Sequence, residues 1–419
     1  MNRRTLAVVA AAVLSCVWAG PGLADMTLEE RMERLEQRLR YLESRIQDQD
    51  ATIRDKDRAI AELKRQQDEL APRWERVEEQ LEEGGTDGGW FQNVEVGGLV
   101  EVEAGWSDSY TGDDESDIVL ATMELGIGAR INDWTRADIL FLHEEDDTDL
   151  EVDVATVTIA APGGPWSLTG GQFYLPFGVF DSHMVSDPLT LELGETRESA
   201  VMLGGAMNDF SGGVYLFNGE NDAGGDQDID NWGAVVGYAT EARGLGLAAN
   251  IGFIDDLGDS DALRDTIDAN LAELAAADPG RAAGLDGRRD DVHGWFASAM
   301  LTAGRFTLIG EYLAATDRFE ADELMDGSAR LKPEAWNVEA GAAFVLGGRD
   351  AAFAVGLQGS DDALALELPR RRYLAALSVW VLDNTMLSFE WAHDEDYGRS
   401  DGGTGNHADT VTAQFAVEF

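Results

Sequence analysis

From residue 93 onward, apolar and polar residues alternate with a period of two. Val94, Val96 and Val100 fall on one side of a strand, and Glu95 and Glu101 fall on the other. Alternation of this kind is typical of strands with one apolar face. It predicts sixteen strands, at about 93–106, 117–130, 134–143, 150–160, 166–174, 199–206, 210–219, 230–241, 244–254, 292–303, 305–316, 333–346, 350–360, 370–382, 384–395 and 407–419.

The connections between these strands alternate between short and long. The short ones are 131–133, 161–165, 207–209, 242–243, 304, 347–349 and 383, and the long ones are 107–116, 144–149, 175–198, 220–229, 255–291, 317–332, 361–369 and 396–406. An even strand number with short periplasmic turns and long outer loops is typical of outer-membrane barrels. We therefore predict an all-β fold, a transmembrane antiparallel β-barrel of about 16 strands over residues 93–419.

Aromatic residues favour a membrane barrel over a soluble β-sandwich. They gather at the ends of the predicted strands, as interfacial girdles require. Trp134 and Trp166 lie beside short turns, and Trp232 and Trp295 lie beside long loops. The last strand alternates and ends on Phe419, an ending that resembles the assembly signal of outer-membrane barrels. We therefore expect a Gram-negative outer-membrane location.

Before the barrel, the apolar residues recur in alternating steps of four and three. This heptad pattern predicts a helical coiled coil over residues 26–83, in the periplasm, followed by a Gly-rich linker at 84–92. A seam of this length favours a homo-oligomer, either a dimer or a trimer. The seam residues are Leu28, Met32, Leu35, Leu39, Leu42, Ile46, Ile53, Ile60, Leu63 and Leu70.

The first 24 residues have the pattern of an export signal. Two arginines, Arg3 and Arg4, precede an apolar run, and Gly22 to Ala24 offer small residues for cleavage. The single cysteine, Cys16, lies inside this segment and is either removed with it or lipidated.

The net charge of the chain excludes some classes of function and favours others. The 419 residues hold 80 Asp and Glu against 31 Lys and Arg, a net charge of -49, which excludes a phosphate-tracking nucleic-acid binder. About sixteen strands leave an aqueous channel, and an acidic lumen would concentrate cations. The acids could instead bind divalent cations at the lipopolysaccharide layer or reflect adaptation to salt.

The long connection at 175–198 differs from the other long connections because it is more apolar. This composition favours a loop that folds inward against the barrel wall and narrows the pore. Alternatively, its polar residues only fix the loop. The groups that it could offer to a solute are Asp181, His183, Asp187, Glu192, Glu195, Arg197 and Glu198.

The same connection carries a family resemblance. GQFYLPFG at 171–178, followed by SDPLTLELGETRES at 186–199, resembles the signature of the LbtU-type siderophore porins. The signal segment, short coiled coil and plug-less barrel are similar to that family's layout. The resemblance implies uptake of a ferric siderophore across the outer membrane without a TonB-dependent plug domain.

Other candidate chemistry is sparse. Asp226, Asp228 and Asp230 could touch Ca²⁺, but they lack the glycine and distal Glu of an EF-hand, so a solvated acidic loop is the alternative. A basic cluster, Arg370, Arg371 and Arg372, could receive an anionic solute or a lipopolysaccharide phosphate. No nucleophile stands beside a base, so we predict neither enzyme activity nor a cofactor.

Three functions follow from the sequence. The first is a siderophore porin, and the second is a general cation-preferring diffusion porin. The third is a structural envelope protein tethered through its coiled coil.

Overall fold

The computed structural model describes residues 93–112, 114–145, 148–219, 229, 231–277, 291–321, 323–324 and 330–419. The chain divides into two units, Met1–Gly89 and Trp90–Phe419. The predicted signal segment, coiled coil and linker lie outside the described residues. Of the helices that are described, none combines the length and apolar character needed to cross a membrane.

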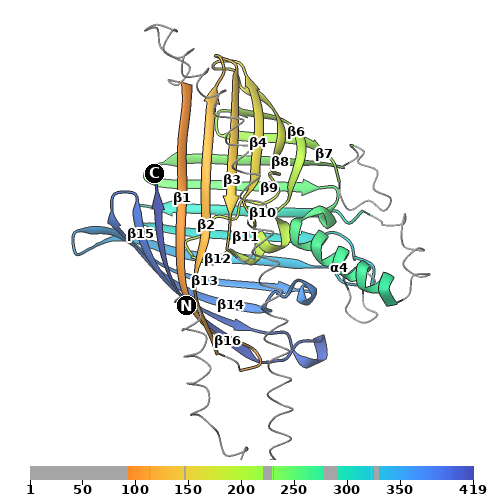
Figure 1. Ribbon diagram of the computed structural model, residues 1–419. Helices are drawn as coiled ribbons and strands as arrows, with labels where there is room; N and C mark the ends of the chain where they lie inside the picture. Colours follow the sequence, from red (N-terminus) through yellow and green to blue (C-terminus); the bar gives the residue numbers. More distant parts are fainter. Residues whose placement is uncertain are drawn as a thin grey trace, which may run out of the picture. The chain divides into compact units, whose positions relative to one another are not determined.

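The described residues form sixteen strands in one closed antiparallel barrel (Figure 1). Each strand pairs with its neighbours in sequence, and β1 pairs with β16 to close the ring. The predicted barrel is confirmed, with strand ends that differ by at most three residues, at the start of β2. The strands are β1 (Val94–Asp108), β2 (Asp114–Arg130), β3 (Thr135–His143), β4 (Glu151–Ala160), β5 (Trp166–Tyr174), β6 (Arg197–Met207), β7 (Phe210–Phe217), β8 (Asn231–Ala242), β9 (Leu245–Ile254), β10 (Gly294–Ala303), β11 (Phe306–Ala315), β12 (Glu334–Leu346), β13 (Arg349–Asp361), β14 (Arg371–Leu382), β15 (Thr385–Glu395) and β16 (His407–Glu418).

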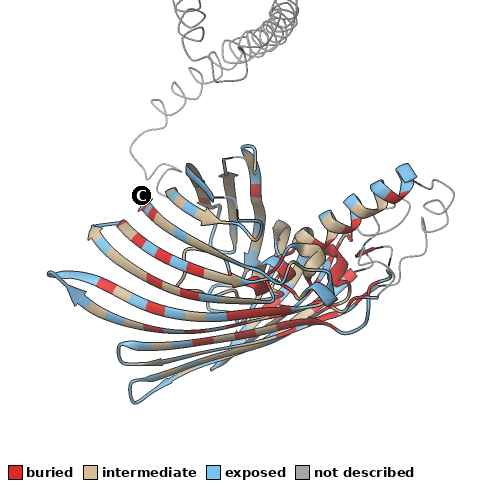
Figure 2. Cartoon of the chain, turned by 90° about the horizontal axis from the view of Figure 1, so that it is seen from below, coloured by how far each residue is buried: buried red, intermediate tan, exposed pale blue. Residues whose placement is uncertain are grey.

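Large apolar side chains cover the outside of the barrel. Exposure alternates along the strands (Figure 2), so that Val355 on β13 and Phe389 on β15 are exposed while Ala354 and Glu390 beside them are buried. The aromatics Trp134 and Trp166 near the short turns are also exposed. An apolar surface of this extent is unfavourable in water and suits contact with lipid.

Backbone hydrogen bonds at the end of the chain help to close the barrel. Gly98 N donates to Phe419 O, and Phe419 N donates to Gly98 O, each at 3.0 Å. A Cβ at position 98 would lie 2.6 Å from the Phe419 ring and 2.7 Å from Glu124 O. Glycine is therefore needed on β1 where the terminal phenylalanine packs.

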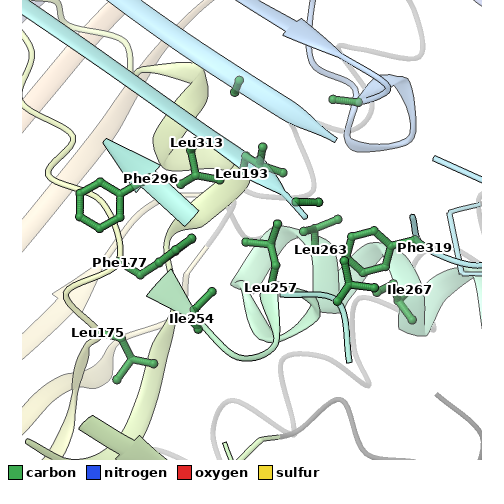
Figure 3. Close-up of a cluster of buried hydrophobic side chains, with 14 of the residues drawn as sticks. Leu175, Phe177, Leu193, Ile254, Leu257, Leu263, Ile267, Phe296, Leu313 and Phe319 are labelled. Carbon is green, nitrogen blue, oxygen red and sulfur yellow. The ribbon is translucent and has the colours of Figure 1, made fainter. Parts of the chain in front are cut away.

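An apolar core fills part of the barrel interior at the end that carries the long loops (Figure 3). It combines residues of the 175–196 connection, of the barrel wall and of two helices, η2 (Leu257–Asp259) and α4 (Asp261–Ala277). Both helices lie in the 255–291 connection, for which the sequence pattern predicts only a long loop. Phe177 packs edge to face on Phe296, with ring centroids 5.5 Å apart. The core members labelled in Figure 3 are Leu175, Phe177, Leu193, Ile254, Leu257, Leu263, Ile267, Phe296, Leu313 and Phe319.

Three further short helices lie in the long connections. Helix α3 (Leu189–Gly194) places Leu189 and Leu193, four residues apart, on its buried face. The 3₁₀ turns η3 (Leu364–Leu366) and η4 (Arg399–Asp401) lie before β14 and β16. Because α3 and α4 contribute to the same core, the 175–196 connection and α4 form one packed layer.

Truncating Phe177 should destabilise this core. Its side chain is fully buried against Phe296, so Phe177→Ala should lower the free energy of unfolding by about 3–5 kcal/mol, and Phe177→Leu should lower it by less than half as much. Guanidinium unfolding of the barrel in lipid vesicles measures both variants. Wild-type stability of Phe177→Ala would contradict the packing.

Candidate functional site

The connection between β5 and β6, residues 175–196, is here called loop 3. Its polar contacts are with side chains on β11, β12, β13 and β15, which are remote from β5 and β6 in the order of the ring. The contacting side chains alternate with exposed apolar residues, so they point to the interior. Loop 3 therefore runs inside the barrel, as its apolar composition suggested.

Glu311 on β11 holds the first part of loop 3. Its carboxylate accepts hydrogen bonds from Val179 N at 2.8 Å and Phe180 N at 3.1 Å, and from Thr190 Oγ1 at 3.0 Å. Phe180 has a positive φ of 57°, so the chain turns directly after the two N–H groups that Glu311 accepts from. One buried carboxylate thus satisfies two loop N–H groups and a hydroxyl.

Glu339 on β12 and Glu390 on β15 hold the middle of the loop in the same way. Glu339 accepts from Ser182 Oγ at 2.8 Å and His183 N at 2.7 Å. Glu390 accepts from Val185 N and from Ser186 Oγ, each at 2.6 Å. All three glutamates are at most 6% exposed. We call Glu311, Glu339 and Glu390 the loop 3 latch.

Gln358 on β13 adds a neutral contact near α3. Its Oε1 accepts from Leu189 N, one of the amides at the start of that helix, at 3.2 Å. The orphan N–H groups of a helix start need such acceptors when they are buried. The wall therefore supplies acceptors to loop 3 from residue 179 to residue 190.

Other acids of loop 3 lie near acids on the opposite wall. Asp187 interacts electrostatically with Glu101 on β1, which in turn lies near Glu103 on the same strand and near Glu124 on β2. We call Glu101, Glu103 and Glu124 the acidic wall. Alternation along β1 and β2 points these three side chains into the barrel. Carboxylates thus face the interior from loop 3 and from the wall.

Glu195 is the most perturbed acid of this group. Burial raises its pKa from the usual 4.5 to about 7, and the negative charges of Asp261, Asp187 and Asp153 add to the increase. Burial also raises the pKa of Asp187, against the opposing effect of the Arg372 guanidinium. Near neutral pH, part of the negative charge around loop 3 is therefore titratable.

The remaining candidates, on loop 3 and at the start of β6, have different surroundings. Burial raises the pKa of Asp181, and His183 packs over Gly341 of β12. Arg197 forms ion pairs with Glu151 and, at 2.8 Å, with Asp153 on β4, and it lies on the outward face of β6, in phase with the exposed Val201.

Glu198, the next residue, points inward and bonds Arg264 of α4 at 3.2 Å. Arg197 and Glu198 thus connect the end of loop 3 to β4 and to α4. Glu192, in contrast, is exposed on α3. Loop 3 therefore presents Asp187, Glu192 and Glu195, rather than all seven candidates, as one acidic group.

The three arginines of the basic cluster diverge. Arg372 points inward and makes two hydrogen bonds to Asp394, at 2.9 and 3.0 Å. Arg371 points outward and lies over the Trp336 ring, 5.4 Å from its centroid. Arg370 approaches Asp401 at 3.7 Å. Alternation along β14 separates Arg371 from Arg372, and Arg370 precedes the strand, so the three guanidinium groups do not form one anion site.

The described residues contain no group of three or more His, Cys, Asp or Glu arranged to hold a metal ion. Asp226, Asp228 and Asp230 lie outside the described residues. The loop 3 latch could not be recognised in the sequence. Each latch residue was visible as a glutamate at an inward position of a strand, but its partner could not be read from the local pattern.

Comparison with known proteins finds distant relatives and a shared fold. No protein-family model matches the chain. A UPF0422 protein of Legionella pneumophila (strain Lens) is 28% identical over 342 residues, which cover 73% of this chain and 62% of that protein. The chain thus spans less than two thirds of the length of this relative.

Two solved structures show the porin fold. OprB of Pseudomonas putida superposes with a TM-score of 0.54 at 11% identity, covering 78% of this chain and 95% of that one. An anion-selective porin from Comamonas acidovorans superposes with a TM-score of 0.51 at 11% identity, covering 78% and 99%. The chain therefore has the fold of outer-membrane porins, and its substrate has to be argued from its own residues.

Removing a latch carboxylate should release loop 3. In Glu390→Ala, Val185 N and Ser186 Oγ lose their acceptor, a cost of about 1–3 kcal/mol for each buried group left unsatisfied. Single-channel current in a planar bilayer should become larger and noisier. The matched control is Glu103→Ala, which removes an inward carboxylate that bonds Gln414 instead of loop 3. Equal currents in the two variants would contradict the latch.

The pKa of Glu195 predicts a pH-dependent charge in the interior. As the pH falls from 8 to 6, Glu195 gains a proton, so the preference for cations should decrease with a midpoint near 7. Because the folded chain disfavours the ionised form, the contribution to stability is present below the usual pKa of 4.5 and is lost as the pH rises through about 7. Reversal potentials in a KCl gradient measure the charge effect. Glu195→Gln should remove this step, and a step of unchanged size would refute its assignment.

Proposed function

We propose that the protein is a passive outer-membrane channel in which loop 3 narrows the lumen. A closed barrel of sixteen strands supports this function, because barrels of this size leave an aqueous path that eight strands would not. The observation that carries the proposal is the loop 3 latch, which holds loop 3 across the interior of the barrel. A loop fixed in this way sets the size and charge of the path.

The charges around the path favour cations. Asp187 on loop 3 faces the acidic wall, Glu192 and Glu195 lie near Asp187 on the same loop, and the inward Arg372 is already paired with Asp394. Aligned carboxylates raise the local concentration of cations and repel small anions. The fold itself does not determine this preference, since a porin of the same fold is anion-selective.

A ferric siderophore is a second candidate for the solute. The segment that resembles the siderophore-porin signature is loop 3 with its flanking strand ends, which places the resemblance at the narrowing element. The acidic interior selects among such complexes, because an anionic chelate would meet repulsion from both sides. The ferric complexes that suit this channel are neutral or positively charged.

The remaining assignments follow from the same proposal. The apolar exterior would lie in outer-membrane lipid, with lipopolysaccharide around the outward Arg371 and Trp336. The coiled coil of residues 26–83 would hold a dimer or trimer together in the periplasm. A tethering role for this segment is tested by deleting it, which should weaken the envelope and leave conductance unchanged.

Planar-bilayer recording tests the function directly. The purified barrel should conduct, and in a salt gradient the reversal potential should report a higher permeability for K⁺ than for Cl⁻. The triple variant Glu101→Gln, Asp187→Asn, Glu195→Gln should lower the K⁺ to Cl⁻ permeability ratio about threefold or more, because three interior charges are lost.

The same recording tests the solute. A cationic ferric trihydroxamate should reduce the current at micromolar concentration, and an anionic ferric polycarboxylate should not. A channel that ignores both complexes would favour general diffusion, and a barrel without conductance would refute the channel.

A further inference from the structure

A hollow lies on the interior wall at the opposite end of the barrel from the apolar core. It has a volume of about 640 Å³ and is formed by the first part of β1, the last part of β2 and the first part of β3. This is the end that carries the short turns, including the 131–133 turn. A volume of this size is in the range of pockets for small molecules.

Glycines make the hollow by leaving the wall without side chains. Gly97 on β1 and Gly126 and Gly128 on β2 are in phase with the inward acids of the same strands. A Cβ at Gly126 would meet only Gly97 O and Leu140 Cδ1, each at 3.7 Å, so free space begins at this position. At Gly128, in contrast, Arg136 Nη2 lies 2.4 Å from where a Cβ would be.

The floor and the rim of the hollow differ in character. Leu99, Leu140 and Val154 provide an apolar floor, which is unusual for the interior of a water-filled barrel. Charged side chains surround this floor. They are Glu95, Glu124, Asp138 and Glu418, with Arg136 as the single cation among them.

The single cation is already engaged. Arg136 Nη1 lies 3.1 Å from Glu95 Oε2, and Arg136 Nε lies 2.8 Å from Asp138 Oδ1. An anion would have to displace one of these carboxylates and would meet the remaining ones. A cation meets an excess of carboxylates with no such competition.

We propose that this hollow is a binding subsite for a small amphipathic organic cation, whose apolar body covers Leu99, Leu140 and Val154 while its charge faces Glu124 and Glu418, the rim carboxylates other than the two paired with Arg136. The subsite rests on the proposed channel function, in which a solute that has passed loop 3 reaches this wall before it leaves the lumen. It extends the cation preference from inorganic ions to molecules with an apolar surface.

Calorimetry of the full barrel in detergent tests the subsite without requiring conduction. Benzyltrimethylammonium is the probe, and benzenesulfonate has the same ring with the opposite charge. The cation should bind, and Gly126→Leu, which places an isobutyl group in the hollow, should weaken it about tenfold or more. Gly105→Leu is the control, because it adds the same group to the inward face of β1 where nothing lies within 4 Å.

A second variant keeps the test decisive if Gly126→Leu does not fold. Glu124→Gln removes one rim charge without adding bulk, and should weaken the cation about threefold. Unchanged affinity in both Gly126→Leu and Glu124→Gln would overturn the site, as would a lack of binding by wild type. Equal binding of benzenesulfonate would overturn the assignment to cations. Conduction without binding refutes only the subsite, whereas binding without conduction refutes the proposed function.

Discussion

The interior of this barrel depends on where the backbone N–H groups of loop 3 find acceptors. A loop that leaves the barrel can use water, but a loop packed against the wall cannot, and each unsatisfied buried group costs about 1–3 kcal/mol. Glu311, Glu339 and Glu390 provide these acceptors from three strands. Each buried carboxylate is in turn stabilised by the N–H and O–H groups that point at it. Loop and wall therefore satisfy one another, and neither arrangement is stable alone.

The apolar core and the latch hold loop 3 through different interactions. Phe177, Leu189 and Leu193 pack against the wall and against α4, and they bury one side of the loop. Asp187 faces the acidic wall, and Glu195 lies near Asp187 and Glu192. Because the packed side and the acidic side belong to one short segment, a change in the packing of loop 3 would also move its charges.

Much of the architecture could be predicted from the sequence, because strand alternation and turn lengths are local signals. The period of two gave strand ends close to those observed, and the apolar composition of loop 3 indicated its inward course. Contacts of the loop with the wall are not local. Val179 and its acceptor Glu311 are 132 residues apart, and Ser186 and Glu390 are 204 residues apart. Their pairing is decided by closure of the ring, which places β11 and β15 across from β5.

Strand alternation also determines on which face of the barrel neighbouring candidate residues lie. Arg371 and Arg372 are adjacent in sequence and so must point to opposite faces of β14, one toward the exterior and one toward the interior. The same rule places Arg197 outside and Glu198 inside. Helix α4 was visible in the sequence, because Leu263, Ile267, Leu271 and Leu274 recur in steps of four, four and three within the acidic 255–291 connection.

The position of Asp187 beside the path is the central claim, and attachment of bulk at that residue tests it most directly. The chain has a single cysteine, Cys16, so Asp187→Cys provides a defined target once that residue is absent or replaced by serine. A bulky methanethiosulfonate reagent, added during single-channel recording, should reduce the current by more than half. The same reagent on Ser109→Cys, in the exposed connection after β1, should leave the current unchanged. Full current in modified Asp187→Cys channels would contradict the location of loop 3 in the path.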